Sequence, residues 1–353
     1  MVQESGPLPS PDTGPDKVLL EVRDFSLRFR GAPSDQINHV NFTVHPGKTL
    51  CVVGESGCGK SVLARSIMGI VQPPGETIEG NLRYYPRDEE GVELLSLGRN
   101  SKKMRDIRGG QIAMVFQEPM VSFSPVHTIG DQITEAILLH ENVSKEEARN
   151  HVIDLLDKVG IPNPAQRIDE YSFRLSGGMR QRAMIALALA CNPGLLIADE
   201  PTTALDVTTQ AQILKLMKDL QQEFGMGMIL ITHNLGVVAQ MADKIVVMYL
   251  GKVVEMADTK TLFEDPKHPY TRELLRSIPK LSRERSTERL TAIRGNVPPP
   301  FARPSGCTFH PRCPQAMRGK CDVVEPSQTK LDDGRVVSCL LYEEDYEEDK
   351  EKS

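Results

Sequence analysis

The hydrophobic and polar positions of this chain alternate near its beginning and later gather into short apolar runs. An alternating stretch follows Lys17–Glu21, which is typical of a strand with one buried face. The later runs are apolar at nearly every position, which is typical of strands buried on both faces of a sheet. Three such runs are found at Thr49–Val53, Leu195–Ala198 and Met228–Thr232.

Two segments have the character of helices. Ser61–Met68 follows the first buried strand, and Ala183–Cys191 is the longest compact apolar run, which indicates a buried helix. No apolar run approaches the roughly 18 residues that a membrane-spanning helix needs. We therefore expect any work at a membrane to be done through partners.

Length and charge narrow the choice of class. A chain of 353 residues is long enough for two domains. Its net charge of −6 does not indicate the basic surface that is typical of nucleic-acid-binding proteins. Residues 1–16 are rich in Pro, Gly and Ser, which indicates a flexible leader and not a signal peptide. The acidic stretch at residues 343–353 is most simply a solvated tail.

A glycine-rich motif joins the first buried strand to the first helix. Gly54-Glu55-Ser56-Gly57-Cys58-Gly59-Lys60-Ser61 fits the pattern G-x-x-x-x-G-K-[ST] of a phosphate-binding loop. Its glycines let backbone N–H groups approach phosphate oxygens, and the helix N-terminus adds partial positive charge. Lys60 is expected to reach the β- and γ-phosphates, and the Ser61 hydroxyl to bind Mg²⁺. A chance glycine turn is the alternative, and the strand–loop–helix context argues against it.

Further motifs follow in a definite order. A second glycine-rich loop, Leu175-Ser176-Gly177-Gly178-Met179-Arg180-Gln181, precedes the second buried strand, which ends in Asp199 and Glu200. Because consecutive strand side chains point to opposite sides, these two carboxylates are expected to do different work. Pro201–Asp206 comes next, and His233 follows the third buried run.

In this order the motifs resemble those of the ATPase subunit of an ABC transporter, over roughly residues 18–340. The resemblance implies an α/β P-loop NTPase core with a RecA-like parallel sheet and an antiparallel β portion near the N-terminus. It also implies a helical subdomain around residues 125–190, and ATP and Mg²⁺ as substrate and cofactor. The ATPase domain is expected to span residues 17–256.

The resemblance also implies roles for single residues. Asp199 holds the Mg²⁺ shell through water, and Glu200 polarises the attacking water as a general base or positioning group. His233 contacts the γ-phosphate. Gln117 matches the Q-loop glutamine, which is expected to bind the nucleotide and Mg²⁺ and to link the Mg²⁺ site to the helical subdomain. Phe29 matches the aromatic that stacks on adenine, although an ordinary core aromatic of a strand is the alternative.

The second glycine-rich loop cannot serve the same nucleotide as Lys60 in the family's arrangement. Its residues Ser176, Gly177, Gly178 and Gln181 complete the site of an opposing subunit, and Asp206 belongs to the adjoining D-loop. The chain has a single phosphate loop and a single signature loop. It is therefore expected to need a second ATPase, either a copy of itself or, as this subfamily commonly does, a homologous chain.

The segment after the ATPase core resembles the C-terminal extension of oligopeptide/dipeptide importers. It contains Phe263–Thr271, with His268-Pro269-Tyr270 inside it, and the Gly295–Pro300 stretch. It also contains His310-Pro311-Arg312-Cys313 and Asp332–Arg335. We expect a small irregular domain over residues 257–342.

Four cysteines of this extension are spaced by intervals of 5, 7 and 17 residues, at Cys307, Cys313, Cys321 and Cys339. Disulfides are rare in a reducing cytosol, and structural zinc typically uses closer cysteine pairs. A [4Fe–4S] cluster takes four thiolates at irregular spacing, and the resemblance implies this cluster, with zinc and then free thiols as alternatives. Cys51, Cys58 and Cys191 lie in the ATPase core, where cysteine usually behaves as a small hydrophobe.

The function that the resemblance implies is ATP hydrolysis at the cytoplasmic face of a bacterial inner membrane, where the chain is peripheral. Hydrolysis would power import of peptides, delivered by an extracytoplasmic binding protein through two permease subunits. Relatives also import oligosaccharides, nickel and opine-like solutes. A non-transport ABC ATPase is a different class, but the short interval from Gln117 to Ser176 has no sustained heptads. A redox-sensing regulator is a third alternative.

Overall fold

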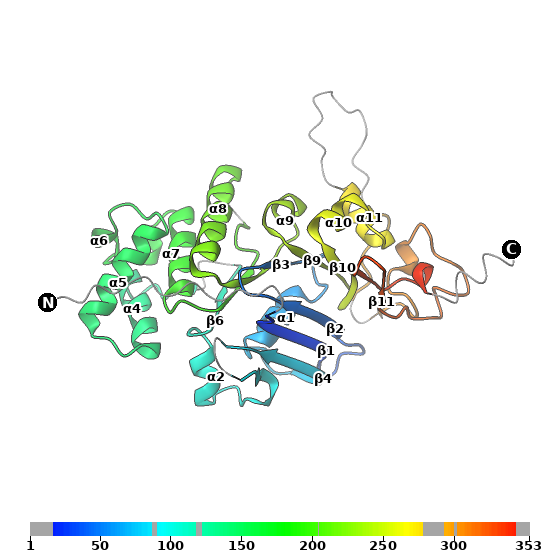
Figure 1. The fold of residues 1–353 in the computed structure, drawn as a ribbon, viewed down its shortest axis with the longest axis horizontal. Coiled ribbons are helices and arrows are strands. Elements are labelled where there is room, and N and C mark those ends of the chain that lie inside the picture. The colour runs from blue at the N-terminus through cyan, green and yellow to red at the C-terminus, as the bar shows by residue number, and fades with distance from the viewer. Residues whose placement is uncertain are drawn as a thin grey trace, which may run out of the picture.

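The computed structural model describes residues 17–86, 90–117, 122–203, 205–277, 293–299 and 302–343. These residues form two sheets and several groups of helices (Figure 1). The first 16 residues and those after 343 lie outside the described residues, and with them the expected leader and nearly all of the acidic tail. Within the described ranges, no helix is both long and apolar enough to cross a membrane.

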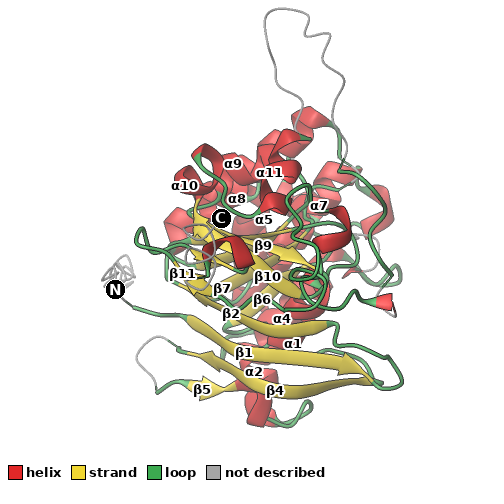
Figure 2. Cartoon of the chain, turned by 90° about the vertical axis from the view of Figure 1, so that its right-hand side faces the viewer, coloured by secondary structure: helices red, strands yellow, loops and turns green. Residues whose placement is uncertain are grey.

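The smaller sheet is antiparallel throughout, with strand order β2-β1-β4-β5. Figure 2 shows it as a layer of its own beside the larger sheet. This arrangement confirms the antiparallel portion expected near the N-terminus. Its strands are β1 (Leu20–Phe29), β2 (Ile37–Val44), β4 (Gly75–Tyr84) and β5 (Val92–Glu93).

The larger sheet has strand order β11-β12-β10-β9-β3-β8-β7-β6. Neighbours from β9 to β6 pair in parallel, whereas β10, β12 and β11 pair antiparallel. The buried strands expected from the three apolar runs are confirmed as β3, β7 and β8. The strands are β3 (Thr49–Val53), β6 (Ile112–Val115), β7 (Leu195–Asp199), β8 (Gly227–Ile231), β9 (Lys244–Tyr249), β10 (Lys252–Asp258), β11 (Thr329–Lys330) and β12 (Val336–Val337).

Strand alternation divides the interior into two cores, one on each face of the larger sheet. Val52 belongs to the core shared with the small sheet and α1, whereas Val53 belongs to the core shared with the helices. Ile197 and Ala198 are separated in the same way. Because both faces are covered, these strands are apolar at nearly every position, which explains their uniform runs in the sequence.

Four helices, α4 to α7, gather at one end of the molecule (Figure 1). These four lie within the range expected for a helical subdomain, and α1 and the second half of α7 occupy the two expected helical segments. The helices are α1 (Lys60–Ile67), α2 (Lys102–Ile107), α4 (Ile129–His140), α5 (Lys145–Lys158), α6 (Pro164–Arg167), α7 (Gly177–Leu189), α8 (Val207–Phe224), α9 (Leu235–Met241), α10 (Thr259–Glu264) and α11 (Pro269–Arg276).

The C-terminal extension shares the sheet and the core of the ATPase. Its strand β12 pairs with β10, and the expected boundary at residue 257 falls inside β10. Tyr249, Tyr270 and Phe309 are fully buried, with the Phe309 ring centroid 5.3 Å from each tyrosine. Within the described residues, the extension continues the larger sheet, and its apolar side chains Tyr270 and Phe309 belong to the core of the ATPase.

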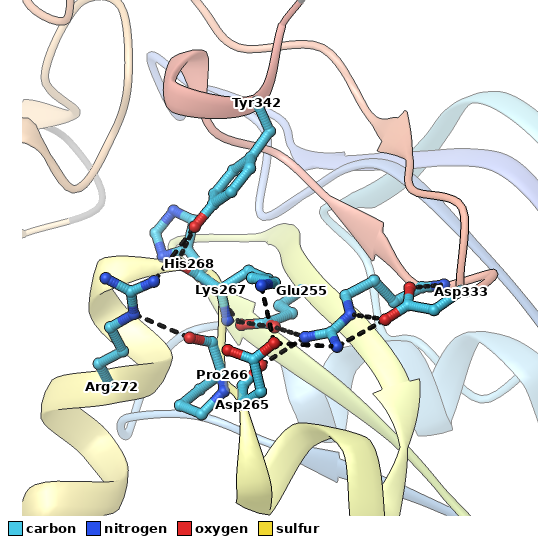
Figure 3. A network of polar contacts seen from close by, with 9 residues as sticks. Glu255, Asp265, Pro266, Lys267, His268, Arg272, Asp333 and Tyr342 are labelled. Atoms are coloured by element: carbon cyan, nitrogen blue, oxygen red, sulfur yellow. Dashed lines mark hydrogen bonds and ion pairs between the residues drawn. The ribbon is translucent and has the colours of Figure 1, made fainter.

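A network of polar contacts fixes the extension where it meets β10 (Figure 3). The Glu255 carboxylate is fully buried and accepts hydrogen bonds from the backbone N–H groups of Lys267 and His268, at 2.8 and 2.9 Å. Arg335 lies 3.9 Å from Glu255 and 2.6 Å from Asp333. A buried carboxylate needs such partners, so this network holds the loop before α11 and the β11–β12 hairpin together.

Replacing Phe309 with Ala should lower the free energy of unfolding by about 3–5 kcal/mol, because it leaves a cavity between Tyr249 and Tyr270. Denaturant unfolding of the full chain measures this change. Val323 lies in the same extension with 69% of its surface exposed. Val323→Ala is therefore the control and should change stability by less than about 0.5 kcal/mol. Equal effects of the two substitutions would contradict the shared core.

Candidate active site

The phosphate loop lies between β3 and α1, and two of its glycines are required by close contacts. Gly54 has φ of 152°, and a Cβ there would lie 2.2 Å from the Met248 carbonyl oxygen. Gly59 has φ of 106°, and a Cβ there would lie 2.9 Å from the Gln36 carbonyl oxygen. The loop is therefore packed tightly against β9 and the segment before β2, while Ser56 and Gly57 remain exposed.

Lys60 lies at the centre of this loop, with 6% of its surface exposed. Its Nζ donates hydrogen bonds to the carbonyl oxygens of Gly54 and Glu55, at 2.8 and 3.1 Å. The Cys58 side chain is buried beside it, and burial raises the pKa of that thiol. The loop thus holds an ammonium group at the N-terminus of α1, where both the charge and the helix dipole favour an anion.

Ser61 and Asp199 meet in the structure although 138 residues separate them. The Ser61 hydroxyl donates a hydrogen bond to Asp199 Oδ1 at 3.0 Å. Asp199 is 3% exposed, and burial raises the pKa of its carboxyl group. A hydroxyl and a carboxylate provide the hard oxygen ligands that Mg²⁺ takes beside phosphate oxygens, so this pair fits the expected metal.

Glu200 begins the turn after β7, and its side chain points to a different set of partners. Its carboxylate accepts hydrogen bonds from Gln117 Nε2 at 3.3 Å and Thr203 Oγ1 at 2.9 Å, and lies 3.2 Å from His233 Nδ1. The structure therefore brings Glu200, Gln117 and His233 together. Thr203 is an additional partner that the sequence did not single out, although it lies in the stretch that resembles a D-loop.

The backbone of Glu200 is held in an uncommon conformation. Its φ is 48°, in the left-handed region that few side chains adopt. Its N–H donates a hydrogen bond to the Ile231 carbonyl oxygen at 2.9 Å, which ties the turn to the end of β8. This conformation separates the Glu200 side chain from Asp199, so the two carboxylates have different partners.

The signature loop and the D-loop lie side by side at the starts of α7 and α8. Ser176 caps α7 by accepting a hydrogen bond from the Met179 N–H, and Ser176 and Gly177 are exposed. A Cβ on Gly178 would lie 2.9 Å from the Thr209 side chain. Asp206 caps α8 by accepting hydrogen bonds from Thr209, which lower the pKa of its carboxyl group.

Two residues have surroundings that bear on their expected roles. Gln181 is 2% exposed, so its side chain lies inside the molecule, away from the surface on which a partner's nucleotide would bind. Phe29 is the last residue of β1, pairs with Gly75 and is partly buried against the smaller core. Its stacking on adenine remains a prediction.

Two residues of the extension contact the phosphate loop, and the sequence did not assign either of them to this site. The Tyr270 hydroxyl accepts a hydrogen bond from the Glu55 N–H at 3.0 Å, and Arg312 pairs with the Glu55 carboxylate. Both residues belong to segments whose sequence resembles peptide importers, and this resemblance was the feature of the sequence that could have drawn attention to them. No local pattern connects them with Glu55.

The four cysteines of the extension influence one another electrostatically. The pKa of Cys339 is raised to about 12 and that of Cys313 to about 11, chiefly by burial, with a smaller contribution from neighbouring thiols of the group. Among the described residues, no three of these sulfurs lie within 4.8 Å of one another. A tetrahedral zinc site needs sulfurs about 3.8 Å apart, so this arrangement does not fit zinc. A four-iron cluster, which places its metal atoms between the thiolates, takes a wider set.

The phosphate loop around Lys60 joins β3 to α1, and Asp199 and Glu200 lie at the end of β7, which is separated from β3 by β8. Together these features define a P-loop ATPase of the ABC class. Solved structures share this fold. The ATP-binding cassette MJ0796, bound to ADP and Pi as a dimer, has a TM-score of 0.59, 24% identity and covers 68% of this chain and 99% of its own. CbiO1 from Clostridium perfringens has a TM-score of 0.60 and 24% identity, and the match covers 71% of this chain and 92% of CbiO1.

Sequence comparisons extend the match into the extension. Residues 37–203 match the ABC transporter family, and residues 254–321 match the oligopeptide/dipeptide transporter C-terminal region. The oligopeptide transport ATP-binding protein AppD of Bacillus subtilis is 50% identical over 93% of this chain and 98% of its own. The dipeptide transport ATP-binding protein DppD of Escherichia coli is 46% identical over 91% of this chain and 96% of its own. The chain belongs to the oligopeptide/dipeptide family of ABC transporter ATP-binding subunits.

Replacing Glu200 with Gln should leave ATP binding intact and lower turnover by about a hundred- to ten-thousand-fold, because an amide does not accept a proton from water. ATP binding to the full chain and ATP hydrolysis by the assembled transporter measure the two effects. Glu223 pairs with Lys158 on the surface, so Glu223→Gln is the control and should hydrolyse ATP normally. Normal turnover by the Glu200 variant would remove Glu200 from the mechanism.

Proposed function

We propose that this chain hydrolyses ATP to power the import of di- and oligopeptides through a membrane transporter. One observation carries the ATPase part of the proposal: Lys60, the Ser61–Asp199 pair and Glu200 converge at one edge of a parallel sheet. The assignment of peptides as the transported solute rests on the relatives, whose similarity extends through nearly the whole chain.

The geometry supports a division of work at this edge. The backbone of the phosphate loop and Lys60 bind the β- and γ-phosphates, and Ser61 and Asp199 hold Mg²⁺. When bound, Mg²⁺ neutralises charge that develops on the phosphate oxygens. Glu200 orients the attacking water and accepts its proton, while Gln117 and His233, which contact the Glu200 carboxylate, keep that carboxylate in place.

A second ATPase subunit completes each site in this proposal. The exposed Ser176 and Gly177 at the start of α7 offer backbone N–H groups to a nucleotide on the opposing subunit. Asp206, exposed at the start of the neighbouring helix α8, lies beside this surface. The partner is a homologous chain or a second copy, arranged head to tail.

The permease subunits bind, in this proposal, where the core meets the helices α4 and α7. A hollow of about 290 Å³ lies there, lined by Met114, Phe116, Met184 and Leu187 among others. Phe116 directly precedes Gln117, so a permease segment in this hollow lies one residue from the Glu200 network. An apolar hollow of this kind suits the apolar face of a short helix. The chain would then be peripheral at the cytoplasmic face of a bacterial inner membrane.

The extension, residues 257–342, holds a [4Fe–4S] cluster in this proposal, with Cys307, Cys313, Cys321 and Cys339 as ligands. The mutual electrostatic influence of the four thiols supports this set. When bound, the cluster would supply a redox-active centre and four metal–thiolate bonds. The Met317 N–H donates a hydrogen bond to the Cys321 sulfur at 3.3 Å, a contact that also suits a thiolate.

Reconstitution with two permeases and a peptide-binding protein tests the transport function. ATP hydrolysis should rise when the binding protein carries a peptide, and labelled peptide should accumulate in the vesicle lumen. Stimulation by an oligosaccharide or nickel, but not by peptides, would assign a different solute. Co-purification of the chain with ribosomes or DNA in place of permeases would contradict import.

Metal analysis of protein purified without oxygen tests the cluster. We expect about four irons and four sulfides per chain, with a broad visible absorption band. Cys339→Ser should lose the iron because it removes a ligand, whereas Cys191→Ser, in the ATPase core, should retain it. One zinc per chain without iron would overturn the cluster and leave the ATPase assignment intact.

A further inference from the structure

We propose that Arg312 is a positioning residue of the ATP site, which holds the phosphate loop through Glu55. This inference rests on the proposed ATPase function and adds a part of the chain that lies far from the P-loop motif. The extension would then be a structural component of the nucleotide site as well as a separate metal-binding segment.

Arg312 and Glu55 form a two-point ion pair across 257 residues of sequence. Arg312 Nη1 lies 2.6 Å from Glu55 Oε2, and Nη2 lies 3.1 Å from Oε1. The Arg312 side chain is 4% exposed and that of Glu55 is 24% exposed. Parallel hydrogen bonds between a guanidinium and a carboxylate fix orientation as well as distance, and limited exposure to water strengthens them.

Other contacts hold the guanidinium in one orientation. Arg312 Nε donates a hydrogen bond to the Arg294 carbonyl oxygen at 3.0 Å, and Nη1 donates one to the Tyr249 hydroxyl at 3.3 Å. Its guanidinium carbon also lies 5.8 Å from the centroid of the Tyr249 ring. Because the arginine is anchored to β9 and the extension, it acts as a rigid support and not as a mobile surface charge.

Glu55 connects Arg312 with Lys60, the lysine of the phosphate loop. Its N–H donates to the Tyr270 hydroxyl at 3.0 Å, and its carbonyl oxygen accepts from Lys60 Nζ at 3.1 Å. Backbone and side chain of Glu55 are therefore both held by the extension, one residue after Gly54. A shift of Glu55 would move the carbonyl group that lies against Lys60.

Charge gives the pair a second effect. The Glu55 carboxylate belongs to a loop that must bind the negatively charged phosphates of ATP. Without Arg312 this carboxylate would repel the phosphates and lose its hydrogen-bond donors in a partly buried position. Arg312 therefore lowers the unfavourable charge of the loop while it fixes its geometry.

A matched control separates this role from general stabilisation of the extension. Arg335 has the same 4% exposure and is ion-paired with Asp333 and Asp265. Its ion-pair partners Glu255, Asp265 and Asp333 lie outside the phosphate loop. If Arg312 merely stabilised the extension, Arg312→Gln and Arg335→Gln would have similar consequences for ATP.

The experiment measures the Kd for Mg²⁺–ATP with the full chain by a fluorescent nucleotide analogue and competition with ATP. Arg312→Gln should raise this Kd about tenfold or more, as expected for an unpaired partly buried carboxylate. Arg335→Gln should change it less than about twofold, as expected for a site without shared contacts. The double variant with Glu55→Gln and Arg312→Gln should bind ATP more tightly than Arg312→Gln alone, because the unpaired charge is gone.

Arg312→Lys keeps the charge and loses the two-point geometry, so its Kd should fall between those of wild type and Arg312→Gln. This variant also keeps the proposal testable if Arg312→Gln does not fold, because both charges remain paired. Equal Kd values for wild type and both Arg312 variants, or no recovery in the double variant, would overturn the inference alone. Failure of the wild-type chain to bind ATP would overturn the proposed function and this inference with it.

Discussion

The in-register pairing of parallel strands is the constraint on which the site depends. Because β3, β8 and β7 run in the same direction, their carboxyl ends meet at one edge of the sheet, with Val52 and Asp199 both opposite Ile231. This register brings the phosphate loop after β3 to the carboxylate that ends β7. A slip of one residue would exchange the two faces of a strand and move Asp199 away from Ser61.

The turn at Glu200 shows how this rigid edge supports an unfavourable local conformation. A left-handed backbone at a residue with a long side chain costs on the order of 1–3 kcal/mol. The hydrogen bond to Ile231 and the buried strands on both sides offset that cost. In return, two adjacent carboxylates face separate groups, one near the Ser61 hydroxyl and the other near His233.

The local parts of the fold were predictable from the sequence, and the long-range parts were not. Uniform apolar runs predicted β3, β7 and β8 because strands covered on both faces leave few polar positions, and those lie at the strand ends. The loop around Lys60 was equally visible because its glycines, lysine and serine follow one another in a single short motif, although the contacts that require Gly54 and Gly59 come from distant segments. By contrast, the pairing of Glu55 with Arg312 and the burial of Gln181 depend on how distant segments pack, which periodicity does not report. The extension was expected to form its own unit because its irregular sequence gave no sign of joining β10.

The pairing of Glu55 with Arg312 also has a consequence for the order in which the protein is made. The ribosome completes the phosphate-loop motif early, but the arginine that supports it follows 257 residues later. At about 5–20 residues per second, this interval lasts on the order of 10 to 50 seconds. During that time the nascent ATPase core carries an unsupported loop. The phosphate loop therefore gains its support only when Arg312 has been synthesised and has folded against it, so a product that ends before Arg312 would bind ATP more weakly.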